Sequence, residues 1–325
     1  FNTAQVAVLT TDQVAILSTT QIRALSTTGM AVLDTAQVAV IETTDIAVLS
    51  TAQVAAINTA GVEALTTDQV SQLTTSGVAA LKTTQVSVLT TDQIATLSTT
   101  QIQNVSTAGF AVMNTAQVAA IETSDIAVLK TSQVAALTTA NMAALTTDQI
   151  AALTTAQVKV ISTAAIQVMD TAQIAAIETS DVAVLSTRQV SALTTAGVAA
   201  LTTDQTAALT TAGVAVFNTA QVAVLTTDQV AILSTTQIRA LSTTGMAVLD
   251  TAQVAAIETT DIAVLSTAQV AAINTAGVEA LTTDQVSQLT TSGVAALKTS
   301  QVSVLTTDQI ATLSTTQIQN VSTAG

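Results

Sequence analysis

Hydrophobic and polar residues follow one another along this chain with a strict period of eight. Threonine stands at position 3 and at every eighth position after it through Thr323, without exception in 41 places. In each octad the third residue after this threonine is Val, Ile, Met or Phe, with Thr206 as the one departure, and the sixth is Leu, Ile, Val, Met or Phe. No insertion interrupts the phase, which predicts an array of units that stack on their neighbours.

The polar positions of the octad predict a short helix. With Thr10 as N-cap, Gln13 stands at the third helical position and completes a capping box, while Leu9 and Val14 form a hydrophobic staple. Nineteen of the 21 acidic residues fall at the N-cap, second or third helical position, where the partial positive charge of a helix N-terminus favours them. We therefore predict an all-α solenoid, or superhelix, of very short capped helices, one per eight-residue repeat.

A β-solenoid is the alternative, because Thr, Val and Ile favour strands. Tight β-coils turn on Gly, Asn or Pro, whereas this chain has no Pro and its ten Gly all replace Gln at one octad position. Val and Leu three residues apart would also face opposite sides of a strand. One continuous α-helix is disfavoured as well, since an eight-residue stripe rotates by about 80° per repeat around it. Both solenoids stay open at this point, with the helical one preferred.

A longer repeat lies above the octad. Residues 1–109 recur as 217–325, and only Val40 (Ala256 in the copy) and Thr84 (Ser300) differ. We predict one continuous solenoid over 1–325, with 1–216 as a larger module and 217–325 as the start of a second copy, in a parent chain much longer than this one. The block that begins at Ile41 returns at Ile121 and Ile177, ten and then seven octads later, through either superhelix geometry or past duplication.

The octad pattern also predicts which side chains are buried. The Val and Leu positions, such as Val62 and Leu65, should lie in the core. The residue after each Val position should face solvent. The charged and long polar residues of the second half of the octad occur there, as in Arg23, Glu63, Gln103 and Lys159.

Composition excludes several classes of function. The net charge of −14 disfavours nucleic acid and anionic membrane surfaces, which bind clustered Lys and Arg. No apolar run approaches the roughly 20 residues of a membrane span. The chain has no His and no Cys, so its hydroxyls lack an activating base and thiolate chemistry is absent. We predict no enzymatic activity, no cofactor and no small-molecule ligand.

The best candidate site is the sequence Glu-Thr-Thr/Ser-Asp, in which two carboxylates stand three residues apart. The four pairs are Glu42 with Asp45, Glu122 with Asp125, Glu178 with Asp181, and Glu258 with Asp261. One helical turn would bring each pair together toward Ca²⁺, but Ca²⁺ takes 6–8 oxygen ligands. The alternative, which we prefer, is a charged variant of the helix cap near the helix dipole. We accordingly assign no metal site and expect the array to be stable without metal.

The segments Leu9–Ala15 and Leu225–Ala231, both Leu-Thr-Thr-Asp-Gln-Val-Ala, resemble Thr/Gln/Val-rich repeats of very long bacterial secreted or surface proteins of adhesin type. The resemblance covers the whole chain, is compositional and brings no functional motif. It implies an extracellular or cell-surface address and a filament, stalk, sheath or matrix role, with self-association along or between arrays. The alternative function is a repetitive binding array: an adhesin, or a surface for Ca²⁺, glycan or, in a β-solenoid with Thr rows, ice.

Overall fold

The computed structural model describes residues 1–321 and consists of short α-helices, each of which begins at one of the repeated threonines. The helices are four to six residues long, and residues 1–321 contain no strand. The predicted all-α solenoid with one short helix per octad is confirmed, and the β-solenoid is wrong. The octad that begins at Thr323 lies outside the described residues.

The chain forms two compact units, Phe1–Val168 and Met169–Gly325. Their boundary falls inside the predicted 216-residue module, so units and sequence modules divide the chain differently. The first unit contains α1 (Thr3–Ala7), α2 (Thr11–Ala15), α3 (Thr19–Arg23), α4 (Thr27–Val32), α5 (Thr35–Ala39), α6 (Thr43–Ile46), α7 (Thr51–Ala56), α8 (Thr59–Ala64), α9 (Thr67–Ser71), α10 (Thr75–Ala80), α11 (Thr83–Val86), α12 (Thr91–Thr96), α13 (Thr99–Ile102), α14 (Thr107–Val112), α15 (Thr115–Ala119), α16 (Thr123–Val128), α17 (Thr131–Val134), α18 (Thr139–Ala144), α19 (Thr147–Ala151), α20 (Thr155–Val158) and α21 (Thr163–Val168). The second contains α22 (Thr171–Ala175), α23 (Thr179–Val182), α24 (Thr187–Ala192), α25 (Thr195–Ala200), α26 (Thr203–Ala208), α27 (Thr211–Ala215), α28 (Thr219–Ala223), α29 (Thr227–Ile232), α30 (Thr235–Ala240), α31 (Thr243–Val248), α32 (Thr251–Ala255), α33 (Thr259–Ile262), α34 (Thr267–Ala272), α35 (Thr275–Ala280), α36 (Thr283–Gln288), α37 (Thr291–Ala295), α38 (Thr299–Val302), α39 (Thr307–Thr312) and α40 (Thr315–Gln319).

The residues of each octad determine where its own helix begins and ends, as α12 illustrates. Its N-cap, Thr90, is extended, with φ −73° and ψ 162°. The Gln93 N–H donates to Thr90 Oγ1 at 3.1 Å, and Gln93 Oε1 accepts the Thr90 N–H at 2.9 Å, which completes the predicted capping box. Leu97 returns to an extended backbone with φ −60° and ψ 131° and ends the helix. No residue among 1–321 needs a positive φ, so the chain turns without glycine or proline.

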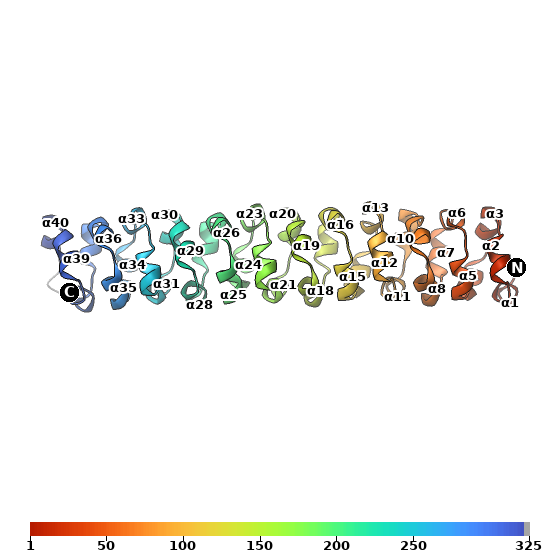
Figure 1. Cartoon of the computed structure of the whole chain (residues 1–325), viewed down its shortest axis with the longest axis horizontal. Coiled ribbons are helices and arrows are strands. Elements are labelled where there is room, and N and C mark those ends of the chain that lie inside the picture. Colours follow the sequence, from red (N-terminus) through yellow and green to blue (C-terminus); the bar gives the residue numbers. More distant parts are fainter. Residues whose placement is uncertain (322–325) are drawn as a thin grey trace. The chain divides into compact units, whose positions relative to one another are not determined.

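Successive coils stack within each unit (Figure 1). A helix packs against the third helix before it, as α9 does on α6 and α29 does on α26. It also reaches the fourth helix before it, because Gln69 of α9 donates its side-chain amide to the carbonyl of Val38 in α5 at 2.9 Å. One coil therefore holds between three and four octads, and a line of neighbouring helices along a unit advances by steps of three and four.

The predicted core is confirmed. Val62 is fully buried and Leu65 is 4% exposed, and the same two octad positions are buried in nearly every interior octad. Glu63 and Lys159 face solvent as predicted. The prediction for Gln103 is wrong in part: this side chain is half-buried, because its Nε2 donates to the carbonyl of Val128 in the next coil at 2.7 Å.

Gly61 and Gly29 occupy the same octad position but have different room for a methyl group. A Cβ on Gly61 would lie 2.9 Å from Ile57 Cγ2 and 3.1 Å from Val38 Cγ2, whereas a Cβ on Gly29 would meet Val6 Cγ2 at 3.5 Å. We expect Gly29→Ala to raise the free energy of unfolding by about 0.5–1 kcal/mol, through the lower entropy cost of alanine in a helix. Gly61→Ala should lower it by about 1 kcal/mol or more, since branched methyls must move. Urea denaturation of both variants tests this, and equal effects would contradict it.

Candidate functional site

A buried glutamine at the third position of most helices links one coil to the next. In α13, Gln101 Oε1 accepts the Ser98 N–H at 2.8 Å, while Nε2 donates to Leu73 O at 2.7 Å and to Val70 O at 3.0 Å. Gln101 is only 3% exposed. In the second unit, Gln229 makes the same bonds to carbonyls 28 and 31 residues earlier, at 2.7 and 2.9 Å. The glutamine thus caps its own helix and ties the C-terminal end of the fourth helix before it.

The sequence interpretation of this glutamine as a cap was correct but incomplete. A cap uses only the side-chain oxygen, so the two amide N–H groups of a buried glutamine still need acceptors. The bare carbonyls at the ends of earlier helices supply them. The sequence contained a signal for this second role. A capping side chain can stay in solvent, but glutamine recurs directly before the core residue of the octad, which indicates that its amide is buried as well.

The four Glu-Thr-Thr/Ser-Asp pairs split between solvent and interior. Each Glu stands at an N-cap, is exposed and makes no side-chain capping bond, so the expected charged cap is present in position but not in bonding. Each Asp stands in the glutamine position and is only 2–3% exposed. The pairs found this way are Glu42 with Asp45, Glu122 with Asp125, Glu178 with Asp181, and Glu258 with Asp261.

The buried aspartates hold their protons more tightly than usual. Burial is the main cause, and the neighbouring Glu122 carboxylate adds to it, so the pKa of Asp125 rises from 3.8 to about 6. The same two causes, with the Glu of each pair as the neighbour, raise the pKa of Asp45, Asp181 and Asp261. The arrangement places an acid where other octads place a hydrogen-bond donor.

Calcium binding by these pairs stays the untested alternative to the charged cap. Two carboxylates supply a minority of the 6–8 oxygens that Ca²⁺ takes. Within residues 1–321, no three acidic side chains come together in a way that would hold a metal ion.

We expect the melting temperature to be the same in Ca²⁺ and in a chelator, because every octad carries its own core residues and most carry a capping box. Melting curves of chains with different octad numbers, recorded in both solutions, test this. A fall in melting temperature with chelator at every length, abolished by Glu42→Gln and Glu258→Gln, would make the pairs true ligands.

Exposed aspartates line one side of each unit. In the second unit a continuous line of neighbouring helices runs through α22, α26, α29, α32, α36 and α39. It is joined by helix packing and by the amides of Gln205 and Gln285. In the first unit the corresponding line runs through α2, α5, α9, α12, α15 and α19, joined by packing and by Gln69 and Gln149. We call these exposed residues the acidic ridge: Asp12, Asp34, Asp68, Asp92 and Asp148 in the first unit, and Asp170, Asp204, Asp228, Asp250, Asp284 and Asp308 in the second.

The Glu–Asp helices border this ridge. Helices α6 and α16 pack on α9 and α19, and α23 and α33 pack on α26 and α36. Ten octads separate α6 from α16 in the first unit and α23 from α33 in the second. In each unit, steps of three, four and three octads join the two helices through helix packing and through the amide of Gln101 or Gln237, so this spacing returns the pair to the same side of its unit.

Lysines and an arginine gather on another line of helices in each unit. Lys82, Lys130 and Lys159 belong to the line α11, α14, α17 and α20. Arg188 and Lys298 belong to the line α24, α28, α31, α34 and α38, joined by packing and by Gln221 and Gln301. We call these five exposed residues the basic side, and no acidic residue occurs on its helices. Arg23 and its repeat Arg239 lie apart, in helices that pack on α6 and α33.

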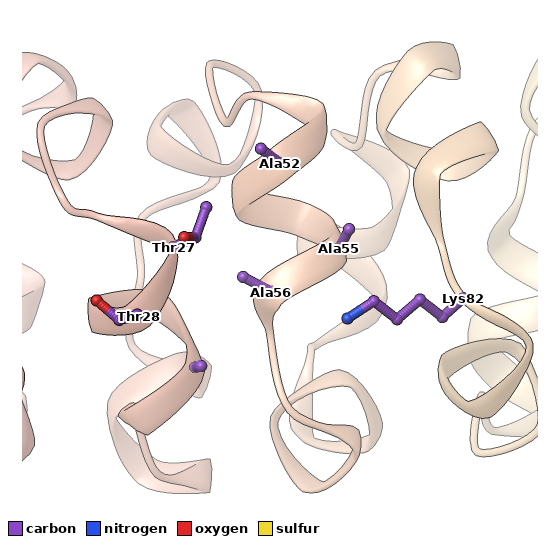
Figure 2. A pocket seen from close by; sticks show the side chains of 7 residues that line it. Thr27, Thr28, Ala52, Ala55, Ala56 and Lys82 are labelled. Carbon is purple, nitrogen blue, oxygen red and sulfur yellow. The ribbon is translucent and has the colours of Figure 1, made fainter.

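Shallow hollows lie on both sides. One of about 370 Å³ is lined by Glu42, Asp68, Thr43 and Thr66, and its twin in the second unit, of about 340 Å³, by Glu258 and Asp284. Another, of about 330 Å³, lies on the basic side between α4, α7 and the start of α11. Figure 2 shows Lys82 extended across it toward Ala55 and Ala56 of α7.

Comparison with known proteins agrees with the repeat architecture. The ALTTAQ repeat family matches residues 38–75, 118–155, 174–211, 207–235 and 254–291, together more than half of the chain. Four of the five matches begin four residues before the Glu of a Glu–Asp pair. No curated protein matches the sequence significantly. This chain therefore belongs to the ALTTAQ repeat family.

Proposed function

We propose that this chain is a structural repeat protein that forms an extracellular filament, stalk or sheath element on a bacterial cell. Its function would be length, stiffness and a repeated surface, without enzymatic activity. The observation that carries the proposal is the hydrogen bonding of the buried glutamines. In most helices the glutamine side chain donates to the same two carbonyls of the preceding coil. Octads can thus be added without changing the fold, as in other solenoids.

One further observation supports this role. Residues 1–109 recur as 217–325 with every charged residue unchanged, so successive modules of this kind would present the same surface. No helix among residues 1–321 has the length and apolar character needed to cross a bilayer.

Chains of one, two and three modules test the structural role. We expect the maximum dimension from small-angle X-ray scattering to increase in proportion to module number, and thermal stability to rise with octad number before it levels off. A maximum dimension that grows only as that of a compact globule would contradict the proposal.

The extracellular address has its own test. Antibodies raised against the purified chain should label intact cells. Labelling that requires permeabilised cells would contradict it. The alternative function is a repetitive binding array. Its ice-binding form required a β-solenoid, and the fold is helical instead.

A further inference from the structure

The acidic ridge and the basic side are complementary surfaces on the same chain. Each has its own line of helices, and a coil of between three and four helices places consecutive helices on different sides. An aspartate caps or lies on every helix of the ridge except α15. The helices of the basic side carry Lys or Arg and no acid, and the acids nearest to them are Glu63 and Glu279, on the helices α8 and α35 that pack on α11 and α38. Within the part of the module that the sequence shows twice, both surfaces recur unchanged, as Asp68 and Asp284 or Lys82 and Lys298 show.

The two surfaces also match in relief. The hollow at Glu42 and Asp68 has two carboxylates and threonine hydroxyls at its rim, which suits a lysine ammonium. The hollow at Lys82 is floored by alanines, whose short side chains leave room for a protruding acidic side chain (Figure 2). The hollow on the ridge thus presents negative charge to a lysine of the basic side, and the hollow at Lys82 presents positive charge to an aspartate of the ridge.

We propose that the acidic ridge of one copy binds the basic side of a second copy, side by side. The inference rests on the proposed structural role and names its partner. Because every copy carries both surfaces, the contact is heterologous and repeats, which builds sheets or bundles instead of closed dimers. A single exposed ion pair contributes little, but the basic side offers three cationic residues in the first unit and two in the second, and linked contacts reinforce one another.

The net charge sets the conditions for this association. At −14, two copies repel each other unless a basic side faces a ridge, so the charge selects this register over ridge against ridge. Salt should weaken the contact, because the Debye length shortens from about 30 Å at 0.01 M to about 10 Å at 0.1 M.

Charge reversal with exchange of partners tests the proposal by sedimentation velocity at low salt. Lys82→Glu with Lys130→Glu reverses two of the five charges of the basic side, and Asp68→Arg with Asp92→Arg reverses two of the eleven charges of the ridge. Both changes use residues that the octad already accepts, since Glu42 is an N-cap and Arg188 a second helical residue. We expect each variant to self-associate at least about tenfold more weakly than the natural chain. An equimolar mixture of the two should regain association.

Several outcomes would overturn the proposal. They are association of either variant at the strength of the natural chain, no gain on mixing, or no association of the natural chain at low salt. Association that requires Ca²⁺ and survives both lysine changes would mean cations bridging two ridges. Far-UV circular dichroism of each variant confirms that it is folded. The scattering test of module length, run at high salt, is independent of this result.

Discussion

Methionine in place of Gln101 should lower the free energy of unfolding of the first unit by about 3 kcal/mol. Methionine keeps the length and volume of the side chain but can neither accept the Ser98 N–H nor donate to Leu73 O and Val70 O. The site is 3% exposed, so water replaces these bonds poorly. An unsatisfied buried donor or acceptor costs about 1–3 kcal/mol, and at least two groups lose their partner.

Gln13 provides the matched control. It stands at the same octad position in the first coil and accepts the Thr10 N–H at 2.9 Å, but it is exposed and its amide nitrogen has no acceptor within residues 1–321. Gln13→Met should therefore cost only the cap, about 1 kcal/mol. Guanidinium denaturation and amide hydrogen exchange of α13 compare the two variants. If both cost the same, the bonds between coils add nothing to stability.

The octad predicted local structure well because its determinants are local. Thr90 and Gln93 lie three residues apart, so capping chemistry marks the helix start, and the spacing of Val62 and Leu65 marks the buried face. Every described helix begins at the predicted threonine.

The contacts between coils could not be predicted from the sequence. Gln101 finds its acceptors 28 and 31 residues earlier, a separation fixed by how the helices turn from one octad to the next. Without that turn, neither the second role of glutamine nor the gathering of aspartates on one side can be inferred. Gln103 was misplaced for the same reason, since its acceptor is the carbonyl of Val128 in the following coil.

The buried aspartates show where the octad departs from its own rule. Asp125 stands in the glutamine position, and no side chain within residues 1–321 donates to Leu97 O, the carbonyl 28 residues before it. Asn141 has the size of aspartic acid and the same octad position, and its Nδ2 donates to Met113 O, also 28 residues earlier, at 3.1 Å. A protonated Asp125 can therefore make the bond that asparagine makes, whereas its carboxylate faces another acceptor.

We accordingly expect Asp125→Asn to stabilise the chain at pH 8 by about 1–2 kcal/mol, less than the full effect of the shifted proton affinity because nearby solvent screens the charge. The pKa of Asp125 in the folded chain is about 6, above the ordinary 3.8, through burial first and Glu122 second. The folded chain thus binds this proton more tightly than the unfolded chain. The resulting stability is complete below the ordinary pKa and is lost as the pH rises through about 6.

Urea denaturation from pH 4 to pH 8 measures this difference. The natural chain should lose stability between pH 4 and pH 6.5, with Asp45, Asp181 and Asp261 contributing in the same direction, and Asp125→Asn should reduce that loss. Asp148→Asn is the control, because Asp148 is exposed in α19, which packs on α16, so this change removes a carboxylate from the surface and leaves the buried one in place. A natural chain that gained stability over this range, or an asparagine variant with an unchanged profile, would show that the carboxylate finds a donor in the folded state, and the isostere argument from Asn141 would fail.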